Sequence, residues 1–206
     1  MAEIREKCVW TQAMTHEGLV PYLVEESAEL IDAVELGDRK GLREELGDVL
    51  WQVLFHSVIA SEDADEPFDI DDVAGDLADK MVRRHPHVFG DETAETPERV
   101  LEVWNAAKAA EKHERTSVLD GLARGMPSLA LAQKLLGKGE KVGVGEDVAL
   151  AAHDAADVGA APGSEEELGE LLLTLAQVAR TNGWDADRAL RAALRSLESD
   201  IRAAEH

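Results

Sequence analysis

The chain has one cysteine, few aromatic residues and far fewer basic than acidic side chains. Because Cys8 is the only cysteine among 206 residues, no disulfide can form within the chain, and we expect a reducing, cytoplasmic setting. Lys and Arg number 21 against 43 Asp and Glu, which gives a formal net charge of −22. Such a surface repels polyanions, so we expect neither a nucleic-acid polymer nor an anionic membrane as a partner.

Long apolar runs, strand-like alternation and a phosphate-binding glycine loop are also missing. No stretch is long enough to span a bilayer, and the charged start Met1–Lys7 lacks an apolar run. No Gly-x-x-x-x-Gly-Lys-Ser/Thr segment occurs, so a P-loop NTPase is not supported. Apolar residues recur instead at helical spacing, which predicts an all-α protein large enough for one domain or two small ones.

The helical spacing is interrupted by stop and cap signals that delimit the expected helices. Gly37-Asp38 is typical of a helix end followed by a new N-cap, so the helices on either side should form an antiparallel hairpin. We expect helices over about 18–36, 38–61, 69–86, from Thr96-Pro97-Glu98 onward, over 128–138, and as a final pair over 164–205 with a break at Asn182-Gly183.

Each helix of the hairpin carries an acidic pair three residues apart, Glu26 with Glu29 and Glu45 with Asp48. Residues at that spacing share a helix face, so four carboxylates can converge. Their mutual repulsion would raise their pKa values unless a hard divalent cation such as Mg²⁺ or Mn²⁺ intervened. The pattern predicts a metal–carboxylate site for a phosphorylated substrate, and the alternative is a solvated, Glu-rich helix face.

Basic residues follow on the third long helix, where Lys80, Arg83 and Arg84 occupy neighbouring turns. In so acidic a chain they would suit phosphate, and the alternative is surface ion pairs with nearby aspartates. Trp104 and Lys108 lie four residues apart on one face of the next helix. They could stack on a base and meet a phosphate, although a tryptophan there could also belong to the core.

The acidic motif Glu25-Glu26-x-x-Glu29, fifteen residues, then Glu45-x-x-Asp48, resembles the signature of the MazG family of nucleoside triphosphate pyrophosphohydrolases. The similarity covers roughly residues 8–145. Where the family usually reads Cys-Pro-Trp-Asp, this chain has Cys8-Val9-Trp10-Thr11. Further matches are Thr15-His16, Pro21-Tyr22-Leu23, Arg43-Glu44, Arg83-Arg84-His85-Pro86-His87-Val88-Phe89 and Val103-Trp104 with Lys108.

The resemblance implies an enzyme that cleaves nucleoside triphosphates, ribose or deoxyribose, between the α and β phosphates, releasing a monophosphate and pyrophosphate. The resemblance also implies a four-helix-bundle-like catalytic domain that uses Mg²⁺ as its cofactor, with Mn²⁺ as a possible substitute. It further implies a homodimer with a role in nucleotide-pool housecleaning. The implied catalytic and metal-binding residues are Glu26, Glu29, Glu45 and Asp48, and the implied substrate-binding residues are Lys80, Arg84, Trp104 and Lys108.

The second half of the chain resembles a degenerate copy of the first. Glu166-Glu167-Leu168-Gly169-Glu170 parallels Glu44-Glu45-Leu46-Gly47-Asp48, but the partner acidic motif is missing, because residues 148–158 offer only Asp154 and Asp157. Ser164 with Glu167 also reads as a capping box. We therefore expect a catalytic domain over 1–115, a Gly/Ala-rich connector over 116–163, and a structural or dimerising helical repeat over 164–206.

Two other classes of protein put glutamates on helices. A ferritin-like di-iron protein needs Glu-x-x-His pairs, and none of the seven histidines has a glutamate three residues before it. A non-catalytic helical regulator or adaptor that kept a MazG-like fold is the remaining alternative, and measured turnover separates it from an enzyme.

Overall fold

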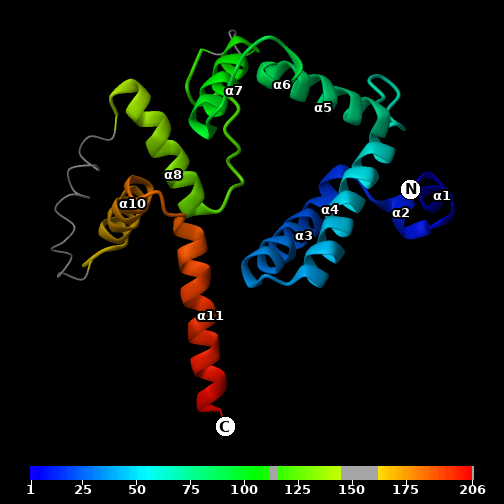
Figure 1. Ribbon diagram of the computed structural model, residues 1–206. Coiled ribbons are helices and arrows are strands. Elements are labelled where there is room, and N and C mark those ends of the chain that lie inside the picture. The colour runs from blue at the N-terminus through cyan, green and yellow to red at the C-terminus, as the bar shows by residue number, and fades with distance from the viewer. Residues whose placement is uncertain (112–115, 145–161, 206) are drawn as a thin grey trace. The chain divides into compact units, whose positions relative to one another are not determined.

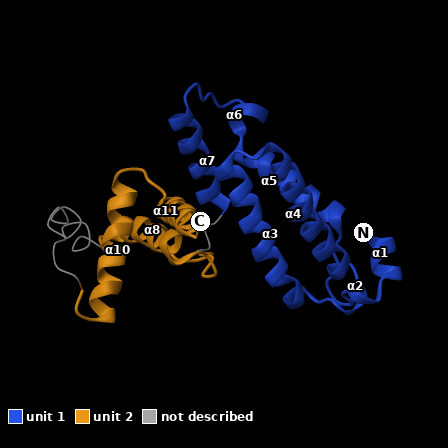
Figure 2. Ribbon diagram, turned by 90° about the horizontal axis from the view of Figure 1, so that it is seen from below, with its two compact units in different colours: residues 1–112 blue, residues 113–206 orange. Residues whose placement is uncertain are grey.

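The structure, a computed structural model, describes residues 1–111, 116–144 and 162–205. In these residues all regular elements are helices, which confirms the all-α prediction. The chain divides into two compact units, Met1–Lys112 and His113–His206 (Figure 2). None of the helices in the described residues is long and apolar enough to cross a membrane.

The first unit holds seven of the described helices, four of which correspond to the expected ones (Figure 1). The short helices α1, α2 and α6 were not predicted. The bounds are α1 Ala2–Lys7, α2 Val9–Ala13, α3 His16–Leu36, α4 Arg39–Ala60, α5 Ile70–Arg84, α6 Pro86–Phe89 and α7 Pro97–Glu111.

Helices α3 and α4 form the predicted antiparallel hairpin, the most extensive helix pairing in the first unit (Figure 1). The Thr15 hydroxyl caps α3 by accepting from the Gly18 N–H at 3.1 Å. Gly37 ends α3 at φ 68°, a left-handed conformation that glycine adopts without steric strain. Asp38 then caps α4, because its carboxylate accepts from the N–H groups of Lys40 and Gly41, each at 3.0 Å.

Helix α5 is defined at both ends by its sequence. Asp69 and Asp72 form a reciprocal capping box at its start, in which each side chain accepts from the other residue's backbone N–H. The helix ends at Arg84, two residues before Pro86, whose ring cannot continue it. This end brings the basic residues of α5 to helix α7, against which α5 packs.

The core of the first unit centres on Phe55 and Leu19, which are almost fully buried. The Phe55 ring contacts Trp10 and Trp51 at centroid distances of 6.1 and 6.0 Å. Thr11, where the family pattern has aspartate, is itself buried, and its hydroxyl donates to the Cys8 carbonyl at 2.9 Å. Of the two departures from the family motif, Thr11 is thus a satisfied packing position next to this core, whereas Val9 is exposed.

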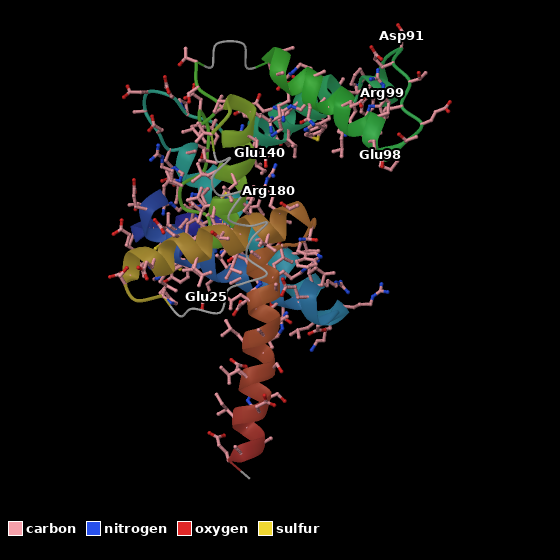
Figure 3. All side chains as sticks on the ribbon, turned by 90° about the vertical axis from the view of Figure 1, so that its left-hand side faces the viewer. Glu25, Asp91, Glu98, Arg99, Glu140 and Arg180 are labelled. Atoms are coloured by element: carbon pink, nitrogen blue, oxygen red, sulfur yellow. The ribbon has the colours of Figure 1, made fainter. Side chains whose placement is uncertain are left out.

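The second unit contains α8 Ser128–Gly139, the 3₁₀ turn η1 Glu140–Val142, α10 Glu165–Thr181 and α11 Ala186–Ala204. Helix α8, from the expected connector, packs against α10 and α11. The guanidinium of Arg180 on α10 pairs with Glu140 of η1, with one donor–acceptor distance of 2.7 Å (Figure 3). Asp154 and Asp157 lie outside the described residues, and the three-part domain division stays a prediction.

Side-chain to backbone hydrogen bonds join α8 to α11. The Asp187 carboxylate accepts from the Ala130 N–H at 2.6 Å, and the Gln133 amide donates to the Trp184 carbonyl at 2.8 Å. Ser164 caps α10 by accepting from the Glu167 N–H, as expected, while the Glu167 carboxylate accepts from the Gly163 N–H at 2.6 Å. These contacts give Asp187 and Glu167 structural partners.

Candidate functional site

Three of the four predicted acidic residues meet between α3 and α4. Glu26 and Glu29 come from α3 and Glu45 from α4, and one carboxylate oxygen of each lies within 4.8 Å of the others. Among the described residues this is the only such group of three or more potential metal-binding side chains. Asp48 lies one turn after Glu45, close enough for its charge to act on Glu26 and Glu45. The structure thus brings the predicted carboxylates to one place on the hairpin.

The cluster is electrostatically unfavourable without a cation. Burial raises the pKa of Glu26, and the negative charges of Asp48, Glu29 and Glu25 raise it further. Burial likewise raises the pKa of Glu45, with added repulsion first from Glu29 and then from Asp48. Partial burial and like charge both favour the protonated acid. The ionised cluster is therefore destabilised, and a bound cation would stabilise it.

One oxygen of the cluster has lost water without gaining a protein partner. Oε2 of Glu45 is buried and accepts no hydrogen bond within the described residues. A buried carboxylate oxygen without a donor is destabilising unless a positive ligand approaches it. The donor set is made only of carboxylate oxygens, which suits a hard cation such as Mg²⁺. The residues present therefore fit the metal that the sequence predicted.

The predicted substrate-binding residues come from two helices, α5 and α7. Arg84 at the end of α5 lies over the ring of Trp104 on α7, with its guanidinium carbon 5.4 Å from the ring centroid. Arg84 also donates from Nε and Nη2 to Glu111 at 3.0 and 2.6 Å. The sequence did not single out Glu111, although it lies on the same face of α7 as Trp104 and Lys108.

Lys80 and Lys108 complete the predicted basic group. Lys80 lies one turn before Arg84 on α5 and is half-buried, while Lys108 on α7 is exposed. Within the described residues, no recorded hydrogen bond or ion pair joins these lysines or Arg84 to the acidic cluster. The structure thus brings Arg84 together with Trp104.

Two groups of histidine contacts lie on these helices. The sequence did not predict the first, between His16 and His56, and it favoured a structural role for the second, which involves His85 and His87. His16 and His56 stack across α3 and α4 with ring centroids 5.0 Å apart and Nδ1 atoms 2.7 Å apart. Burial, then the charge of His16, lowers the pKa of His56. His85 meets the Trp104 ring edge-on at 4.9 Å and lies 5.5 Å from His87. These rings support α3–α4 and α5–α7 packing respectively.

Residues 14–89 match a family model described as the MazG nucleotide pyrophosphohydrolase domain. The match spans the acidic cluster, Lys80 and Arg84. The nucleoside triphosphate pyrophosphohydrolase of Escherichia coli strain K12 is 34% identical over 213 aligned residues, covering 96% of this chain and 80% of that protein. The chain belongs to the MazG family. The resemblance stated from the sequence motifs is thereby confirmed, and with it the enzyme class.

Another relative is similar to this chain over its full length. An uncharacterized 26.1 kDa protein in the blaB 3' region of Streptomyces cacaoi is 50% identical over 205 residues, covering 100% of this chain and 79% of that protein. Among solved structures, a MazG-related protein from Thermotoga maritima aligns with a TM-score of 0.45 and 26% identity, covering 52% of this chain and 91% of that chain.

Proposed function

We propose that this MazG-family chain hydrolyses nucleoside triphosphates between the α and β phosphates, releasing a nucleoside monophosphate and pyrophosphate. The observation that carries the proposal is the convergence of Glu26, Glu29 and Glu45 within 4.8 Å. The E. coli relative, named a nucleoside triphosphate pyrophosphohydrolase, supports the same reaction class. Ribonucleotides and deoxyribonucleotides are both candidate substrates, and removal of unwanted nucleotides in the cytoplasm is the proposed role.

Glu26, Glu29, Glu45 and Asp48 would hold Mg²⁺, with Mn²⁺ as a substitute. When bound, such an ion offsets phosphate charge, polarises the phosphoanhydride and acidifies a water nucleophile. The protein's own contribution is to gather the four side chains from two helices fixed by the Gly37–Asp38 turn. Burial and then the charges of neighbouring carboxylates raise the pKa values of Glu26 and Glu45, and a bound cation would offset both effects.

The remaining residues would bind the substrate itself. Lys80, Arg84 and Lys108 would meet the phosphates, where their positive charges offset charge that develops on the pyrophosphate leaving group. Trp104 would stack on the base. Since Arg84 lies over one face of the indole, a base would use the opposite face. Metal-binding and base-binding groups would then belong to the same unit of the chain.

Apolar side chains on the α3–α4 hairpin support the proposal of a homodimer. Leu23, Val34, Leu46, Leu50 and Val53 are all more than one-third exposed. Exposed apolar side chains that form a patch are typical of an interface between subunits, and the hairpin carries several of them. The second unit would serve a structural or dimerising role, because Glu167 is engaged in capping and, among the described residues, Glu170 belongs to no cluster of three or more potential metal-binding side chains.

The test is Mg²⁺-dependent pyrophosphate release from single nucleotides by the wild-type chain and by Glu45→Gln, with Glu170→Gln as the matched control in the second unit. Loss of release in Glu45→Gln alone supports the proposed site. A wild-type protein that binds Mg²⁺ but hydrolyses no triphosphate would favour a regulatory role instead.

A further inference from the structure

The contact between α5 and α7 contains an acidic residue with no role in the reaction proposed above. Glu111 is the last residue of α7, and its side chain is 22% exposed. Hydrogen bonds and charges from Arg83 and Arg84 lower the pKa of Glu111, and Arg84 contributes most. Glu111 is therefore ionised and engaged.

The engagement of Arg84 is geometrically specific. Glu111 Oε2 accepts from both Nε and Nη2 of Arg84, at 3.0 and 2.6 Å, and so occupies one side of the planar guanidinium. The ring of Trp104 covers one of its faces. The Arg84 side chain is only 11% exposed, whereas that of Arg83, which Glu111 contacts at 3.3 Å, is 58% exposed. Arg84 is thus more deeply buried and held by shorter hydrogen bonds than Arg83.

A guanidinium has five N–H donors arranged in a rigid fork. The contacts with Glu111 use two of them, which leaves the outer N–H of Nη2 and both N–H groups of Nη1. The outer N–H of Nη2 and one N–H of Nη1 form the end-on edge of the fork, which can bind two oxygens of a phosphate side by side, while the other N–H of Nη1 points back toward Cδ. The helical spacing of Trp104, Lys108 and Glu111 puts a ring, a cation and a carboxylate along one face of α7.

From this arrangement we infer that Glu111 is a positioning residue: with Trp104 it holds the Arg84 guanidinium so that its end-on edge meets a phosphate of the bound nucleoside triphosphate. This inference rests on the proposed function for the identity of the ligand. Preorientation reduces the side-chain entropy lost on binding, so affinity should depend on Glu111 even though its negative charge would repel a phosphate. If Glu111 only competed with the phosphate for Arg84, removal of Glu111 would instead strengthen binding.

The experiment is a double-mutant cycle in binding, because a residue that acts through another has no further effect once that other is gone. Wild type, Arg84→Ala, Glu111→Ala and the double variant are titrated calorimetrically with the Mg²⁺ complex of α,β-methylene-ATP, which resists cleavage at the proposed bond. We expect each single change to weaken binding about 10-fold and the double variant to match Arg84→Ala within about 2-fold.

Two further variants separate positioning from general destabilisation. Glu111→Gln keeps an acceptor for Arg84 and should stay within about 3-fold of wild-type affinity. Glu102 lies on the same helix, and its carboxylate accepts from Arg99 at 3.0 Å. The variant Glu102→Ala should bind the analogue with wild-type affinity. If Glu111→Ala proves unfolded by circular dichroism, Glu111→Leu, which keeps the volume but has no acceptor, takes its place in the cycle.

Several results would overturn the inference: wild-type or tighter affinity in Glu111→Ala, losses that multiply in the double variant, or no binding of the analogue by wild type. Pyrophosphate release from ATP by the wild type is measured in parallel. No release together with a coupled cycle counts against the proposed reaction alone. Release together with an uncoupled cycle counts against the role of Glu111 alone.

Discussion

Burial of Glu26 and the negative charge of Asp48 on the facing helix together raise the pKa of Glu26. These two residues belong to different helices of one hairpin. Glu26 lies three positions before Glu29 on α3, and Asp48 lies three positions after Glu45 on α4. Their interaction is therefore a product of the α3–α4 packing, and it supports the proposed cation site on the hairpin.

Removing one carboxylate should abolish hydrolysis and preserve the fold. Glu45→Gln or Asp48→Asn deletes a negatively charged ligand, and we expect pyrophosphate release to fall at least about 100-fold at saturating Mg²⁺. Glu170→Gln, the corresponding change in the second unit, should stay within about 2-fold of wild type. Unchanged activity in Glu45→Gln with an intact circular dichroism spectrum would refute the site assignment.

Mg²⁺ should raise the melting temperature of the wild type, because a ligand that binds only the folded state stabilises it. At a concentration about 100 times the dissociation constant the gain is about 2.7 kcal/mol. Differential scanning fluorimetry with Mg²⁺ and with a chelator measures it. In Glu45→Gln the shift should shrink or vanish, and a wild-type melting curve indifferent to both additions would contradict a preformed metal site.

Ionisation of Glu26 should lower the stability of the metal-free protein. Because the folded-state pKa of Glu26 lies above the ordinary value of about 4.3, the folded state favours the protonated form. Stability contributed by this proton is present below that ordinary value and is lost as pH rises through the folded-state pKa. Glu26→Gln in chelator should therefore melt higher than wild type at pH 7.5, and equally near pH 4. A lower melting point at pH 7.5 would contradict the repulsion described for the cluster.

Truncation of the buried Phe55 should lower the free energy of unfolding much more than truncation of the exposed Phe89. Phe55 is fully buried between Trp10 and Trp51, so Phe55→Ala should cost about 3–5 kcal/mol in the free energy of unfolding. Phe89 is 63% exposed, and Phe89→Ala should change it by only about 0.5 kcal/mol. Guanidinium unfolding followed by tryptophan fluorescence compares the two, and similar losses would contradict the core assignment.

The apolar face of α4 predicts the state of association. Light scattering after gel filtration should give twice the 22.3 kDa mass of the chain. Leu50 is 55% exposed, and Leu50→Glu puts a charge on the proposed interface, so this variant should elute as a monomer. A wild-type monomer at micromolar concentration would contradict the homodimer.

Much of the local structure could be predicted because helix caps depend on a few neighbouring residues that can be recognised in the sequence. Gly37, Asp38 and Asp69 mark helix boundaries at the positions where the structure places them. The short helices α1 and α2 could not be predicted, since they carry no apolar period and are held by tertiary contacts such as the Arg5–Glu62 ion pair at 2.7 Å. Propensity alone does not determine segments of this length.

The site shows the same division between local and tertiary information. The spacing of Glu26, Glu29, Glu45 and Asp48 on two adjoining helices was enough to expect a cluster. Glu111 could not be found in this way, because its partner Arg84 lies on another helix and only the packing of α5 on α7 pairs them. Helical spacing identifies which residues share a face, and only the fold identifies what that face meets.

The most direct measurement of the proposed reaction is the identity of its products. The protein is incubated with Mg²⁺ and single ribo- or deoxyribonucleoside triphosphates, and the nucleotides are resolved by ion-exchange chromatography with a separate assay for pyrophosphate. We predict nucleoside monophosphate and pyrophosphate in equal amounts, both absent with Glu45→Gln. Nucleoside diphosphate with inorganic phosphate, or no product from any triphosphate, would contradict the account.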